Sequence, residues 1–75
     1  MGKLKVFSAS ELVKLLAAHG FEKIRQKGSH IVMQKKHNNT TKTVIIPDHK
    51  EIKTGTLQSV IRQSGLEKDI FEEKN

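Results

Sequence analysis

Several residue types are rare or absent in this 75-residue chain, and each absence excludes a class of structure or function. It has no cysteine, which excludes disulfides, thiolate metal sites and most of the common zinc modules. It has no tryptophan or tyrosine and only three phenylalanines, which argues against the aromatic platforms on which single-stranded nucleic acids stack. The longest apolar run has four residues, Leu15 to Ala18, and is too short to span a membrane.

The sequence also lacks a hydrophobic signal region at its N-terminus. We therefore expect a single cytoplasmic domain over residues 1–75. A domain of this size buries only about 60% of the surface that its unfolded chain exposes, so its core is thin.

Acidic residues are missing from the middle of the chain. The net charge is +6, and residues 23–47 contain six Lys or Arg and no Asp or Glu. The excess positive charge is therefore concentrated in one segment, which predicts a surface that binds an anion. The six basic residues are Lys23, Arg25, Lys27, Lys35, Lys36 and Lys42.

The first helix is expected over residues 9–19. Ser8 as N-cap and Glu11 three residues later form a capping box, and Gly20 is suited to end the helix in the left-handed conformation. Helical spacing places one stripe on the buried side: Leu12, Leu15, Leu16 and His19.

Three strands are expected next, over residues 21–27, 30–36 and 42–46. Gly28-Ser29 is a turn signal between the first two, and the polar residues 37–41 form a hairpin loop between the last two. In the first strand, alternation places Lys23, Arg25 and Lys27 on one face and Glu22, Ile24 and Gln26 on the other.

The second strand carries apolar residues on both faces, so alternation alone leaves its inward face open. One face has Ile31 and Met33, and the opposite face has His30, Val32, Gln34 and Lys36.

A second helix is expected to begin after Thr54, its N-cap, and to end at Gly65. Residues 67–71 can add a short helix, and residues 72–75 are expected to fray. The order α-β-β-β-α predicts an α+β fold in which a three-stranded antiparallel sheet has both helices on one face. The second face of the sheet is then left for solvent or a ligand.

His30 is the candidate for chemistry. It follows the flexible Gly28-Ser29 pair, where a phosphate can approach the backbone, and an imidazole exchanges protons near neutral pH. The alternative is a strand-end histidine that caps a turn, and position alone leaves the two interpretations even. Asp48, His49 and Glu51 lack a recognisable ligand spacing, so we expect no metal site and no cofactor.

An ordered set of segments resembles the HicA toxin family over about residues 8–71. The matching segments are Gly20-Phe21, Arg25-Gln26-Lys27-Gly28-Ser29-His30, Val44-Ile45-Ile46-Pro47, Gly55-Thr56-Leu57 and Ile61-Arg62-Gln63-Ser64-Gly65-Leu66. The resemblance implies a fold similar to a double-stranded RNA-binding domain. It also implies an mRNA interferase that needs no ribosome, a catalytic histidine at His30, and a HicB-like antitoxin as partner.

The first hypothesis is therefore a metal-independent endoribonuclease of a type II toxin–antitoxin pair. His30 would act as general base or acid. Either Lys27, Lys35 or a water takes the second proton-transfer role, or the enzyme is slow. The residues expected to hold mRNA are Lys23, Arg25, Lys27, Gly28, Ser29, Lys35 and Lys36. Two rival hypotheses are a double-stranded RNA-binding module without chemistry, and an interaction domain whose basic face meets an acidic protein.

Overall fold

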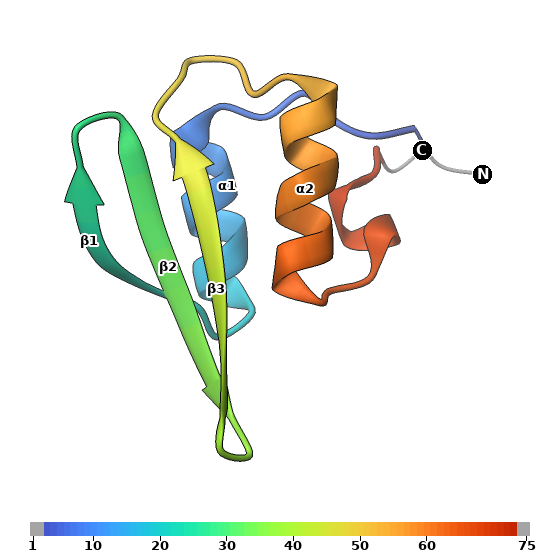
Figure 1. Cartoon of the computed structure of the whole chain (residues 1–75). Coiled ribbons are helices and arrows are strands. Elements are labelled where there is room, and N and C mark those ends of the chain that lie inside the picture. The colour runs from blue at the N-terminus through green and yellow to red at the C-terminus, as the bar shows by residue number, and fades with distance from the viewer. Residues whose placement is uncertain (1–2, 74–75) are drawn as a thin grey trace.

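Two helices and a three-stranded antiparallel sheet follow one another in the order α1-β1-β2-β3-α2, as the sequence predicts (Figure 1). This is a computed structural model, and it describes residues 3–73. The elements are α1 (Ala9–Ala18), β1 (Glu22–Lys27), β2 (His30–His37), β3 (Thr40–Pro47), α2 (Thr54–Ser64) and the 3-10 helix η1 (Lys68–Phe71).

The predicted capping box begins α1. The Ser8 hydroxyl accepts a hydrogen bond from the Glu11 backbone N–H, and the Glu11 carboxylate accepts one from the Ser8 backbone N–H at 2.9 Å. These hydrogen bonds to the Ser8 backbone and then its side chain lower the pKa of Glu11 below its ordinary value. The helix ends as expected, because Gly20 takes a φ of +93° after the C-cap His19.

The strand order β1-β2-β3 makes β2 the central strand, and its pairing with β3 settles the inward face. Ile31 lies opposite Ile46 and Met33 opposite Val44, and all four are buried. The other face, called here the outer face, carries Val32 opposite Ile45, which is 45% exposed. Both helices therefore cover the Ile31 and Met33 side, where most of the apolar area of the sheet is removed from water.

The predicted alternation along β1 is wrong at its centre. The register shifts between Lys23, opposite Met33, and Arg25, opposite Val32, so that Ile24 is an extra residue. Such a bulge moves every later side chain to the opposite face from the one simple alternation gives. Lys23 therefore shares the helix side with Gln26, whereas Arg25 and Lys27 lie on the outer face.

The β2–β3 hairpin is tighter and longer than the sequence suggests. Asn38 and Asn39 alone form the turn, with φ of +48° and +67°, and pairing continues to His37 opposite Thr40. Positive φ at both central residues matches the twist of the strands, and asparagine tolerates it. Figure 1 shows that this hairpin projects well beyond the ends of both helices.

The second helix begins one residue earlier than expected, because Lys53 and not Thr54 is its N-cap. Its end is confirmed, since Gly65 is the C-cap with a φ of +70°. The Gln63 side chain on α2 accepts a hydrogen bond from the Ile45 backbone N–H at 3.2 Å. This contact covers one open donor at the β3 edge of the sheet.

The two terminal segments pair with one another, which corrects the expectation that residues 72–75 fray. Leu4 bridges to Glu72, and the Glu73 N–H donates to the Lys3 carbonyl at 2.7 Å; Lys74 and Asn75 lie outside the described residues. The ring of Phe71 meets that of Phe7 edge to face at 6.2 Å. The short helix predicted over residues 67–71 is confirmed as η1.

The core between the two layers consists of Phe7, Ala9, Leu12, Leu16, Phe21, Ile31, Met33, Val44, Ile46, Ile52, Leu57, Val60 and Phe71.

Among residues 3–73, no helix combines the length and the apolar composition that crossing a membrane requires.

Candidate nucleic-acid interface

A two-residue turn, Gly28-Ser29, joins β1 to β2. Gly28 has a φ of +57°, where residues with a Cβ are strained. A Cβ added at this position would meet no atom within 4 Å. Glycine is therefore needed here for its backbone conformation and not for lack of space, and the surroundings of Gly28 stay open to a ligand.

His30 is the first residue of β2 and lies on the outer face, where its side chain is exposed. Its neighbours across the sheet are Lys27 on β1 and Pro47 on β3. The sequence leaves the exposure of this residue open, and the buried pair Ile31 and Met33 decides it. An exposed imidazole on an open sheet can be reached by a polymer that no small pocket would admit.

The pleat of the sheet distributes the basic segment over two sides. Three of its cations share the outer face with His30, namely Arg25, Lys27 and Lys36. Glu22 also lies on this face, opposite Gln34 and away from the Gly28-Ser29 turn. The end of the outer face at which His30 lies is thus positively charged through Arg25 and Lys27 on β1, whereas Lys36 lies toward the far end of β2.

The other cations lie on the side of the helices. Lys23 is opposite Met33, and Lys35 is opposite Lys42. The half-buried Lys35 places its Nζ 5.9 Å from the centre of the Phe21 ring, which is a cation–π contact. The RNA-binding prediction for Lys23 and Lys35 stays a prediction, and these residues lie across the sheet from His30.

None of the other three histidines pairs with His30 in the sheet. His19 is half-buried, and its Nδ1 lies 2.9 Å from the Leu15 carbonyl oxygen, in keeping with a packing role. His37 is exposed and lies beside Asn38 at the tip of the projecting hairpin. His49 is exposed in the loop after β3, where its carbonyl accepts from the Ala9 N–H at 3.0 Å.

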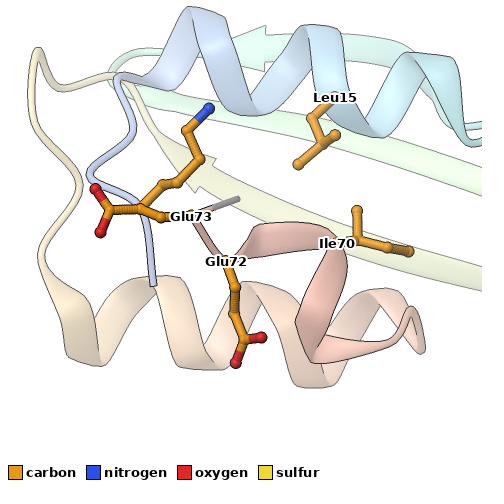
Figure 2. A pocket seen from close by; sticks show the side chains of 5 residues that line it. Leu15, Ile70, Glu72 and Glu73 are labelled. Carbon is orange, nitrogen blue, oxygen red and sulfur yellow. The ribbon is translucent and has the colours of Figure 1, made fainter. Parts of the chain in front are cut away.

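A hollow of about 530 Å³ lies between α1 and η1, away from the predicted residues. Figure 2 shows Leu15 and Ile70 pointing toward one another across it. Glu72, Glu73 and Lys5 also line this hollow, so its charged residues include more acidic than basic ones. Within residues 3–73, no three histidine or acidic side chains gather closely enough to hold a metal ion.

Sequence reasoning missed two residues that contact the turn. The Asp48 backbone N–H donates to the Ser29 carbonyl at 2.7 Å, and the Gln26 amide donates to the Asp48 carboxylate at 3.0 Å. These residues are far apart in the sequence, and the pairing of β3 with β2 brings them together. No local motif signals such a contact.

Comparison with protein families places the chain in a known one. A family model described as the HicA toxin of bacterial toxin–antitoxin systems matches residues 9–66, which is more than three quarters of the chain. The matched span begins with α1 and ends just after α2, so it includes the whole sheet. No curated protein matches the chain.

Proposed function

The chain belongs to the HicA family of toxins of bacterial toxin–antitoxin systems, and from this premise we propose that it is an endoribonuclease. Its substrate in this proposal is mRNA in the cytoplasm, which it cleaves without the ribosome. The observation that carries the proposal is the exposed imidazole of His30, on the outer face with Arg25 and Lys27. A proton-transfer group and fixed cations are the two things that this chemistry requires.

RNA supplies the nucleophile for its own cleavage. The 2′-hydroxyl oxygen attacks the adjacent phosphorus, the bond to the 5′-oxygen breaks, and a cyclic phosphate remains on one product. His30 acts as the base that removes the 2′-hydroxyl proton or as the acid that protonates the leaving oxygen. Arg25 and Lys27 stabilise the charge that develops on the phosphate oxygens.

The proposed protein partner is a HicB-like antitoxin. A basic outer face favours a partner with an acidic surface, because complementary charge speeds and orients association. We expect the antitoxin to cover His30 or the cations beside it and so to exclude RNA. A complex that leaves this face open and still blocks cleavage would count against such occlusion.

The catalytic role is tested with His30→Ala and a matched control, His37→Ala, which removes another exposed histidine of β2. Each purified protein is incubated with RNA in chelator and without ribosomes. We expect unaltered protein and His37→Ala to cleave, and His30→Ala to be slower by about 100-fold or more. Equal rates for His30→Ala and unaltered protein would remove His30 from the mechanism.

A double-stranded RNA-binding module without chemistry is the second candidate, favoured by the α-β-β-β-α order of the fold. Both candidates predict RNA binding that weakens with salt, so binding does not separate them. Growth arrest on expression that His30→Ala relieves favours the nuclease. Harmless expression with retained RNA binding favours the module.

A further inference from the structure

Both carbonyl oxygens of the Gly28-Ser29 turn accept hydrogen bonds. The Gln26 side-chain amide donates to the Gly28 carbonyl at 3.2 Å, and the Asp48 backbone N–H donates to the Ser29 carbonyl at 2.7 Å. The same Gln26 amide donates to the Asp48 Oδ2 at 3.0 Å. The turn is thus held from both sides by residues that also bind one another.

Both hydrogens and the oxygen of the Gln26 side-chain amide take part in hydrogen bonds. Its nitrogen has two hydrogens for the two acceptors, and its Oε1 accepts from the Lys23 Nζ at 3.2 Å. Rotation of the amide would set a nitrogen against the Lys23 ammonium and an oxygen against the Asp48 carboxylate. The network therefore fixes one orientation of the side chain. The bulge in β1 is what puts Lys23 and Gln26 on the same side.

These hydrogen bonds are made to the two residues that precede His30. The His30 Cα pairs with Lys27 and Pro47, and the bond from Asp48 to Ser29 continues the β2–β3 ladder one residue beyond that pair. A turn without these bonds is free to shift, and the first residue of β2 shifts with it. Misplacement of a reacting group by about 1 Å can reduce a rate by about 100-fold.

We propose that Gln26 and Asp48 are positioning residues for His30, which they act on through the Gly28-Ser29 turn. The inference rests on the proposed ribonuclease function. Neither residue needs to touch RNA, since both line a hollow on the helix side of the sheet together with residues of α1. The network also gives Lys23 a role, the orientation of the Gln26 amide, that is separate from binding phosphate.

The test measures kcat and KM for RNA cleavage by Gln26→Ala, Asp48→Ala and Asp48→Asn. We expect each alanine variant to lower kcat about tenfold and to leave KM within about twofold. Asp48→Asn keeps an acceptor oxygen without the charge and retains most of the activity. The double alanine variant is no slower than the slower single variant, because both remove the same contact.

The matched control is Gln34→Ala, which removes another exposed hydrogen bond of the sheet, from Gln34 to the Thr43 hydroxyl at 3.3 Å. It is expected to keep both kinetic constants. Unchanged kcat in both alanine variants overturns the inference. So does Asp48→Asn with the same loss as Asp48→Ala, because the charge and not the geometry would then matter.

Failure of the proposed function is distinguishable from failure of this inference. If unaltered protein cleaves, His30→Ala does not, and Gln26→Ala and Asp48→Ala match unaltered protein, only the inference fails. If unaltered protein does not cleave at all, amide NMR spectra still test whether Gln26 and Asp48 hold the Gly28-Ser29 turn and His30 in place. Gln26→Ala and Asp48→Ala must then shift the Ser29 and His30 amide signals, whereas Gln34→Ala leaves them in place, and unshifted signals overturn the inference.

Discussion

Gly28→Ala tests whether the turn before His30 depends on backbone conformation alone. The φ of +57° makes a Cβ unfavourable by about 1–2 kcal/mol. Because no atom lies within 4 Å of that Cβ, no clash adds to the cost. Alanine also stiffens the unfolded chain, which offsets about 0.4–1 kcal/mol. The net loss in the free energy of unfolding is therefore about 1 kcal/mol.

Gly55→Ala is the matched control. Gly55 lies in the first turn of α2, has no positive φ, and also has open space around its Cβ position. Here alanine is the better helix residue, so the variant is expected to be as stable as unaltered protein or more stable by up to about 1 kcal/mol. Gly28→Asn is expected to lie between, since Asn38 and Asn39 already take φ of +48° and +67° in this chain.

Urea and thermal unfolding measure these differences. For a domain of 60–100 residues, about 1 kcal/mol corresponds to a shift in Tm of about 4–8 °C. Gly28→Ala is expected to melt lower by this amount, and Gly55→Ala to melt at the same temperature or higher. Equal melting of the two variants would refute the reasoning, because the Cβ has room at both positions and only Gly28 has a positive φ.

Two further predictions concern charged side chains. The lowered pKa of Glu11 means that its carboxylate stabilises the fold above the ordinary pKa of about 4.3 and loses this effect as the pH falls through the lowered value. Glu11→Gln is therefore expected to be less stable than unaltered protein at pH 7, with the difference disappearing under acid in thermal unfolding; parallel curves would contradict this. Lys36→Ala is expected to weaken RNA binding and its salt dependence without changing Tm. Lys35→Ala is expected to lower Tm, because it loses the contact with Phe21. Equal Tm values for these two variants would contradict the structural role of Lys35.

The helices could be predicted because their signals are local. The Ser8 and Glu11 capping box and the left-handed Gly20 and Gly65 each involve residues within one helical turn. The exception at α2, where Lys53 replaces Thr54 as N-cap, has no side-chain cap hydrogen bond to mark the position. Local hydrogen bonding therefore predicts helix ends best where a side chain takes part in it.

The sheet was harder because its pairing is not local. Nothing in residues 22–27 marks the bulge at Ile24, and it becomes visible only from the partners of Lys23 and Arg25 on β2. The β2–β3 hairpin extends past the helices, so its outermost pairs have no buried residue to set an alternation. The polar composition of residues 37–41 predicts a five-residue loop, whereas the pairing leaves only Asn38 and Asn39 in the turn.

The candidate site was predictable in part for the same reason. His30 follows a turn that Gly28 marks in the sequence, whereas its exposure depends on which face of β2 the helices cover. The contact of Gln26 with Asp48 spans 22 residues and needs the β3 pairing to exist. Sequence patterns thus predict His30 as the candidate but do not predict the residues that hold the turn before it.

The distribution of charge limits how strongly this surface can bind RNA. Residues 23–47 contain six permanent cations, but only Arg25, Lys27 and Lys36 share the outer face with His30. Each phosphate contact to a single strand contributes about −0.7 to the slope of log K against log salt concentration, so three contacts give about −2 and six give about −4. A slope near −2 would mean that RNA lies on the outer face alone. A slope near −4 would require contacts with cations beyond these three, such as Lys23 on the helix side of the sheet.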